Sequence, residues 1–175
     1  RQPFAPQDDW AVGADGRVAV LRAANYHAEW WTPAGRQVNG PAVVYEKVPV
    51  TSADKERYRK AAAANQRGGF RIQIGGSGGG RAAPPPVLDE PTWPPVKPAF
   101  REASLLVAPD GMLWAERYGA DGAARVYDLF DAQGRLVRQV ELPKASRLVG
   151  FGPASLYVAT TTDDDLEALS RYRRL

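Results

Sequence analysis

Few residues in this sequence have the types and spacing that catalysis or metal binding requires. The 175 residues include one histidine, His27, and no cysteine, so a thiol nucleophile and cysteine-based zinc sites are excluded. A lone histidine within a predicted strand is more often a packed or surface side chain than a ligand. The residue types of a Ser-His-Asp triad are all present, but no serine lies in a Gly-x-Ser-x-Gly motif. We therefore expect a non-catalytic chain without a cofactor.

Two short segments contain residue types that bind phosphate or metal ions in other proteins. The glycine-rich run at 75–80 is not followed by a Lys-Ser or Lys-Thr pair, which favours a linker over a phosphate-binding loop. Asp163, Asp164 and Asp165 are weak candidates for calcium ligands, because calcium takes several oxygen donors. They lack the alternating spacing and the distal Glu of a calcium loop, so a solvated turn is the main interpretation.

The elements around these residues are predicted to be repeated antiparallel β-units. Two stretches each combine an Asp-Gly turn, two runs of strand-forming residues and a second turn with Gly-Arg, at Gly35-Arg36 and at Gly134-Arg135. Asp-Gly between apolar runs indicates a hairpin, since glycine accepts the positive φ of tight turns. The predicted strands are 10–13, 17–23, 28–32, 105–108, 113–118, 124–130 and 136–142, and a third, shorter copy has 148–150, 155–160 and 166–172.

The segment between the first two copies differs in composition. The chain contains 17 glycines and 15 prolines, and much of this excess over ordinary composition lies in Gly68–Pro98. Ser52 is predicted to cap a short helix that reaches Ala64, and Phe70–Ile74 is predicted to form a brief strand. The Gly/Pro-rich part cannot bury enough apolar surface to fold alone. We expect it to be an extended insertion over the surface.

The fold class expected from these patterns is all-β, with antiparallel β-propeller blades, because four-stranded units recurring every ~40–50 residues are typical of blades. Residues 1–50 are assigned to one blade and 101–143 to another. Residues 51–100 hold the helix and the insertion, and 144–175 form a partial blade.

Several segments resemble the C-terminal blades of six-bladed β-propeller proteins of soil bacteria such as the Gemmatimonadota, distant relatives of NHL-repeat propellers. The matching segments are Trp10–Val18, Glu29–Arg36, Trp93–Phe100, Leu106–Trp114 and Leu129–Leu136. The resemblance covers nearly the whole chain apart from the insertion. It implies a partial ring of two full blades plus three strands, and a periplasmic or extracellular location. It implies no activity, because propellers host many functions.

Contacts with a protein partner are expected at exposed aromatic residues and at the last predicted strand, which would otherwise present an unpaired edge. Trp30 and Trp31 are adjacent in a strand and must face opposite sides, so one of them is expected to be exposed. The contact candidates are Trp93, Trp31, Leu166, Leu169 and Tyr172.

The charge balance argues against nucleic-acid binding, and the hydropathy argues against a membrane-spanning helix. The net charge of +3 is too balanced for a nucleic-acid-binding face. No apolar run approaches the ~20 residues of a membrane-spanning helix. The sequence begins at Arg1 without a signal peptide, which suggests a processed or incomplete N-terminus.

The leading functional hypothesis is a non-catalytic propeller segment that binds or scaffolds another protein, as an extrinsic subunit of an extracytoplasmic or membrane-attached assembly. A protein partner or N-terminal blades absent from this chain would complete it. The alternative is a calcium-dependent propeller hydrolase or lyase whose active site lies mostly in such absent blades. A third option is carbohydrate or small-ligand binding on exposed aromatic residues.

Overall fold

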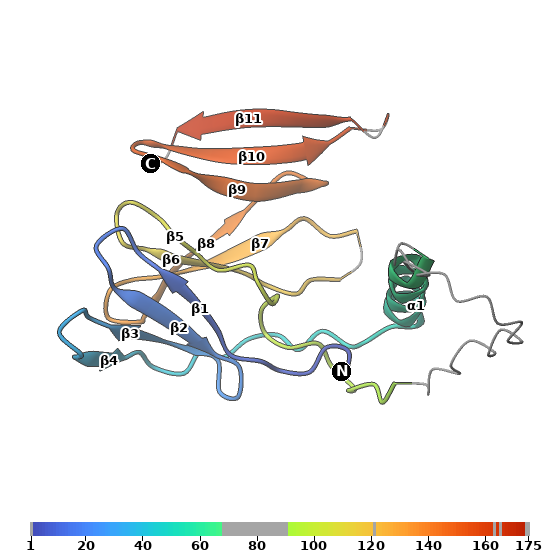
Figure 1. Cartoon of the computed structure of the whole chain (residues 1–175), viewed down its shortest axis with the longest axis horizontal. Helices are drawn as coiled ribbons and strands as arrows, with labels where there is room; N and C mark the ends of the chain where they lie inside the picture. Colours follow the sequence, from blue (N-terminus) through green and yellow to red (C-terminus); the bar gives the residue numbers. More distant parts are fainter. Residues whose placement is uncertain (1, 68–90, 121, 163, 165, 174–175) are drawn as a thin grey trace, which may run out of the picture.

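The computed structural model describes residues 2–67, 91–120, 122–162, 164 and 166–173, which form three antiparallel sheets and one helix (Figure 1). In each sheet the strands neighbour one another in chain order. Sheet 1 contains β1 (Asp9–Val12), β2 (Val18–Arg22), β3 (His27–Trp31) and β4 (Gln37–Asn39). Sheet 2 contains β5 (Leu106–Val107), β6 (Leu113–Glu116), β7 (Val126–Phe130) and β8 (Leu136–Glu141). Sheet 3 contains β9 (Ser146–Gly152), β10 (Ser155–Thr161) and β11 (Glu167–Arg173).

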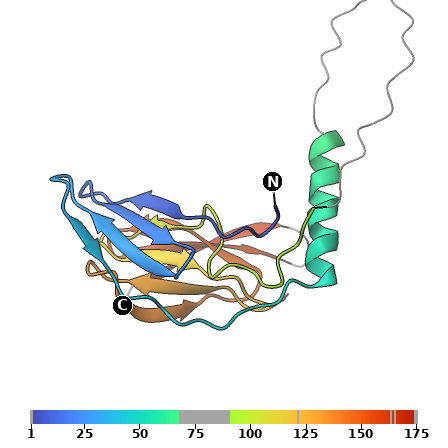
Figure 2. The same ribbon diagram turned by 90° about the horizontal axis from the view of Figure 1, so that it is seen from below.

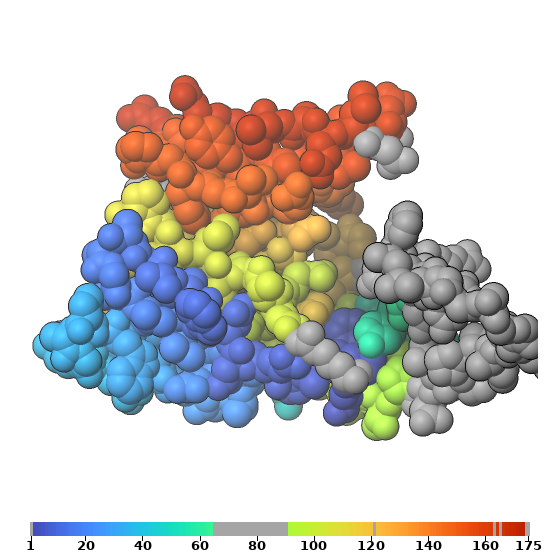
Figure 3. Space-filling model, in the orientation of Figure 1, coloured from blue at the N-terminus to red at the C-terminus, as the bar shows by residue number. Residues whose placement is uncertain are grey.

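The three sheets are stacked, with sheet 2 in the middle. The space-filling view shows β9–β11 as a separate layer above the rest of the molecule (Figure 3). One apolar core lies between sheets 1 and 2 and a second lies between sheets 2 and 3. Because successive strand residues point to opposite faces, neighbouring residues of β6 enter different cores: Leu113 and Ala115 enter the first, and Trp114 enters the second.

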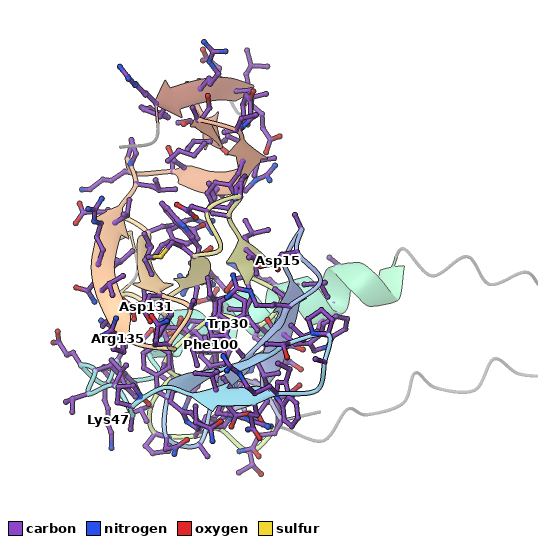
Figure 4. The ribbon with its side chains drawn as sticks, turned by 90° about the vertical axis from the view of Figure 1, so that its left-hand side faces the viewer. Asp15, Trp30, Lys47, Phe100, Asp131 and Arg135 are labelled. Atoms are coloured by element: carbon purple, nitrogen blue, oxygen red, sulfur yellow. The ribbon has the colours of Figure 1, made fainter. Side chains whose placement is uncertain are left out.

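The first core is built around aromatic side chains from four different segments. Trp30 on β3 is almost fully buried, and its indole Nε1 donates a 2.8 Å hydrogen bond to the main-chain carbonyl of Asp131. Tyr26, from the β2–β3 turn, packs edge-on against Phe130 and stacks on Phe100. Figure 4 shows Trp30 and Phe100 in the interior between the two sheets. Burying aromatic residues of this size accounts for much of the stability of such an interface.

The Asp-Gly turns form for the reason expected from the sequence. Gly16 has a φ of +78° and Gly111 a φ of +82°, a conformation that only glycine adopts at low cost. The preceding Asp15 accepts a 3.1 Å hydrogen bond from the main-chain N–H of Arg17. Asp110 accepts a bond of the same length from the N–H of Met112.

The helix α1 (Ser52–Arg67) lies to one side of the sheets, beyond the ends of the strands (Figures 1 and 2). Its cap is Thr51 and not Ser52, which is the first helical residue. The Thr51 hydroxyl accepts a 3.2 Å bond from the N–H of Asp54, and the Asp54 carboxylate accepts a 2.9 Å bond from the N–H of Thr51. This reciprocal pair is a capping box. A bridge between Pro49 and Val96 joins the two ends of the segment that carries the helix.

The prediction of antiparallel sheets with four, four and three strands is confirmed. The short β4 had no predicted range of its own, and α1 extends three residues past Ala64. The sheets form no closed ring among the described residues. The predicted strand Phe70–Ile74 and most of the Gly/Pro-rich insertion lie outside them. In the part of the chain that is described, no helix is long and apolar enough to cross a bilayer.

Candidate interaction surface

The strands of sheets 1 and 2 correspond residue by residue around their first and last turns, which have the same length and the same hydrogen bonds, whereas the β2–β3 turn is shorter than the β6–β7 loop. In sheet 1 the turn closes with Val12 paired to Val18, and in sheet 2 with Val107 paired to Leu113. The last turns also match. The main-chain N–H groups of Thr32 and Asp131 donate to the carbonyl oxygens of Arg36 and Arg135, respectively. In return, the N–H of each arginine donates to the side-chain oxygen of the same Thr32 or Asp131. Trp31 of β3 therefore occupies the position that Phe130 occupies in β7.

The correspondence identifies an uncovered apolar face. In sheet 2, the face turned toward sheet 1 is buried, and its apolar residues are Leu105, Val107, Leu113, Ala115 and Phe130. The equivalent residues of sheet 1 are Trp10, Val12, Val18, Val20 and Trp31, all on the face turned away from sheet 2. Trp10 is 65% exposed, Val12 55% and Trp31 37%, whereas Phe130 is fully buried. We call these five residues of sheet 1 the outer apolar face.

A carboxylate occupies the same position on both faces. Asp128 of β7 is fully buried and accepts a hydrogen bond from the phenol of Tyr26, which lies in the β2–β3 turn of sheet 1. Burial and the charge of Asp128 raise the pKa of Tyr26 far above its ordinary value, so the phenol stays a hydrogen-bond donor. The equivalent carboxylate of sheet 1 is Glu29, beside the outer apolar face.

Glu29 is held by donors from its own sheet. Arg22 bonds its carboxylate at 2.8 Å, and the His27 ring lies 3.1 Å from the other oxygen. The hydrogen bond from Arg22 is the main reason why the pKa of Glu29 is below its ordinary value. Arg22 also bonds Asp8 at 2.8 Å. This row of charged groups flanks the outer apolar face and fixes a polar border beside it.

Sheet 3 has no fourth strand among the described residues. There β11 pairs with β10 and leaves its other edge free, although β3 and β7, which hold the third position in the other sheets, each pair with a fourth strand. The outward side of sheet 3 is more polar than the outer apolar face, because Thr161, Glu167 and Arg171 lie on it beside Leu169. The two ends of the stack therefore differ: sheet 1 presents an apolar face and sheet 3 presents an open edge.

The structure places the predicted contact residues in three separate positions. Trp31 lies on the outer apolar face, and Trp30 beside it is buried, as the alternation predicted. Leu166, Leu169 and Tyr172 are exposed on or next to β11. Trp93 is half-buried and packs edge-on against Tyr58 of α1, so its ring contacts lie within the chain.

The remaining candidates give no metal site among the described residues, where no three His, Asp or Glu side chains gather. Asp163 and Asp165 lie outside the described residues, and Asp164 is in a turn. Trp10 and Val12 were not predicted as contact residues. Their signal was present in the register of the repeat, because they align with Leu105 and Val107.

Comparisons of the chain with protein-family models, with curated proteins and with solved structures gave no match.

Proposed function

We propose that this chain is a non-catalytic β-sheet scaffold that binds a further antiparallel sheet on its outer apolar face. The observation that carries the proposal is the equivalence between that face and the buried face of sheet 2. Within this molecule, such a face is covered by a four-stranded antiparallel sheet, namely sheet 1. The same kind of occupant would bury Trp10, Val12 and Trp31.

An exposed apolar patch of this composition favours association. Trp10 and Trp31 lie on the same side of sheet 1, and Val18 and Val20 lie between them on β2. Aromatic residues in contiguous patches are enriched at interfaces that bind proteins. Burying them against a sheet contributes about 25 cal/mol for each Å² of apolar surface removed from water.

A ring of stacked sheets is the arrangement that we propose for the complete assembly, in agreement with the resemblance to propeller blades. In such a ring each sheet covers the next, so the outer apolar face of sheet 1 receives the preceding sheet. The free edge of β11 receives a fourth strand, because exposed edges pair readily with added strands.

The experiment uses a photoreactive phenylalanine derivative placed singly at Val12 or Trp31 in the protein as its host makes it. The matched controls carry the same residue at Arg36 and Arg138, exposed strand or turn positions outside the outer apolar face. Mass spectrometry of the adducts identifies the residues joined to each position.

The proposal predicts one discrete adduct from both positions 12 and 31, joined to alternate apolar residues of an antiparallel strand. No adduct from these positions would contradict it. Adducts that form equally from Arg36 and Arg138 would also contradict it, because they would indicate unspecific contact.

A further inference from the structure

A second feature, separate from the outer apolar face and from the proposed function, is a pocket of about 340 Å³ beside sheet 2. Its walls come from residues 46–49, which lead from β4 to α1, and from the β6–β7 loop, β7 and β8. None of the five residues of the outer apolar face lines it. The volume is within the usual range of small-molecule sites, about 300–1,000 Å³.

Arg117, the first residue after β6, lines this pocket with a side chain that is only 18% exposed. Its Nε is buried without a hydrogen-bond partner, and its guanidinium group donates no hydrogen bond to the described residues. The guanidinium carbon lies 5.9 Å from the centroid of the Tyr45 ring, which offers no conventional acceptor. A buried donor without an acceptor is costly. The N–H groups of Arg117 therefore require an acceptor that the described residues do not supply.

The neighbouring carboxylate of Asp128 balances the charge of Arg117 without accepting its N–H groups. The Nε of Arg117 lies 3.7 Å from Oδ2 of Asp128, which is too long for a hydrogen bond. The phenol of Tyr26 already bonds that oxygen, and the side-chain amide of Gln139 donates to the other oxygen at 2.8 Å. The ion pair thus holds the positive charge in place and leaves the donors of the guanidinium group to a ligand.

The charges around the pocket favour a ligand with a single negative charge. Glu46 and Lys47 are adjacent and exposed, and both line the pocket. Glu46 and Asp128 offset the charges of Lys47 and Arg117, so these four groups have no net charge. The pocket therefore offers hydrogen-bond donors on a guanidinium group and no excess of positive charge. A second negative charge on the ligand would be repelled by both carboxylates.

The remaining lining is largely apolar. Val48, Pro49, Ala124 and Val126 come from two separate segments of the chain and line the same pocket as Arg117. Pockets that combine an apolar wall with a few polar groups are typical of small-molecule sites, in which the polar groups fix the orientation of the ligand.

We infer that this pocket binds a small monocarboxylic acid, whose carboxylate contacts Arg117 and whose short apolar group lies against Val48 and Val126. The planar guanidinium group matches the two oxygens of a carboxylate in paired hydrogen bonds. The exposed ammonium of Lys47 adds an attraction at longer range.

The test is a titration followed by amide chemical shifts, with isovalerate and benzoate as separate probes. Isovaleramide, which has nearly the same shape as isovalerate but no charge, is the control for apolar contact alone. Inorganic phosphate is the control for any oxyanion.

Two variants change the pocket in different ways. Arg117→Lys keeps the positive charge beside Asp128 and removes the planar guanidinium group. Its matched control is Arg135→Lys, in an exposed turn outside the pocket. Ala124→Phe fills the pocket and leaves both Arg117 and Asp128 in place.

We expect saturable shifts around residues 117–126 with at least one of the two carboxylates, and a roughly tenfold weaker Kd in Arg117→Lys and in Ala124→Phe. Arg135→Lys should bind as the wild type does. No saturable shift with either carboxylate would overturn the inference. Equal binding of isovaleramide, tighter binding of phosphate, or unchanged binding in both pocket variants would overturn it as well.

Discussion

The phenol of Tyr26 donates a hydrogen bond to the buried carboxylate of Asp128, which lies 102 residues later in the chain. Tyr26 lies in the β2–β3 turn of sheet 1 and Asp128 lies on β7 of sheet 2, so the bond links the two sides of the first core. Tyr26 has a φ of +37°, an unfavourable conformation for a residue other than glycine that surrounding contacts must hold in place. Asp128 in sheet 2 corresponds to Glu29 in sheet 1. Among the described residues, no sheet covers the face of sheet 1 on which Glu29 lies.

Replacing Tyr26 by phenylalanine removes the donor and keeps the ring. Asp128 would retain the 2.8 Å bond from Gln139 but lose one buried partner. We expect a loss of about 2 kcal/mol in the free energy of unfolding, measured by urea denaturation, because leaving a buried acceptor short of a donor costs about 1–3 kcal/mol. The control Tyr45→Phe, in the ring that packs on Tyr26, should change stability by less than about 0.5 kcal/mol. Equal losses in both variants would disprove the role of the phenol.

The adjacent residues Trp30 and Trp31 should differ sharply in their contribution to stability. Trp30→Ala empties a fully packed site and removes the bond to Asp131, so we expect a loss of about 3–5 kcal/mol. Trp31→Ala changes a side chain that is 37% exposed and should cost about 1 kcal/mol or less in the isolated chain. Thermal or urea unfolding measures both, and a larger effect at Trp31 would contradict the assignment of the faces.

The glycines of the two Gly-Arg turns should also differ. Gly35 and Gly134 have φ values of +78° and +71°, so alanine is strained at both, by about 1–2 kcal/mol. A Cβ at Gly134 would lie 2.4 Å from the carbonyl oxygen of Ala28 and 2.7 Å from the Cα of Gly40, whereas a Cβ at Gly35 meets nothing within 4 Å.

Gly134→Ala should therefore cost at least about 2 kcal/mol more than Gly35→Ala in the free energy of unfolding. The difference isolates the contact between the sheet 2 turn and sheet 1, since the conformational strain is common to both variants. Similar losses in urea unfolding would show that the two sheets are not packed as closely as described.

The pH dependence of the free energy of unfolding should show the lowered pKa of Asp54. Burial acts to raise its pKa, but the hydrogen bonds from Thr51 and Lys97 outweigh burial and lower the pKa from 3.8 to about 2. The folded state thus favours the carboxylate form, so this stabilisation is complete above about pH 4 and is lost as the pH falls toward 2. A shift of this size corresponds to about 2 kcal/mol.

The measurement is the free energy of unfolding of the wild type and of Asp54→Asn between pH 5 and pH 2.5. The wild type should lose about 2 kcal/mol more than the variant over this range. Asp164→Asn, at an exposed turn, should follow the wild-type curve. Parallel curves for the wild type and Asp54→Asn would rule out the depressed pKa.

Local chemistry in the sequence was enough to predict the sheets. The Asp-Gly and Gly-Arg turns depend on glycine at a positive φ and on nearby side-chain bonds, which involve residues only a few positions apart. The opposite orientation of Trp30 and Trp31 follows from the two-residue period of a strand. The third strand of sheet 3 was predicted at 166–172 as the last strand of a third, shorter copy of the repeat, and β11 is Glu167–Arg173.

Features that depend on distant residues were not predictable in this way. Lys97 follows a proline-rich stretch, yet it is buried because Asp54 of α1 and the carbonyl of Gly119 meet it there. An open cleft beside α1 is lined by residues as far apart in the chain as Arg57 and Lys144, and no local pattern relates them. The cap of α1 moved from Ser52 to Thr51 because both residues can cap, and only the bonds with Asp54 decide between them.

Hydroxyl-radical footprinting of the isolated chain and of the assembly made by the host tests the central claim most directly. Trp10 and Trp31 report on the outer apolar face, and buried Trp30 serves as an internal reference in the same strand. The account predicts that Trp10 and Trp31 are oxidised readily in the isolated chain and become several-fold protected in the assembly, while Trp30 is protected in both. Equal oxidation of Trp10 and Trp31 in the two samples would show that nothing covers this face, and would contradict the account.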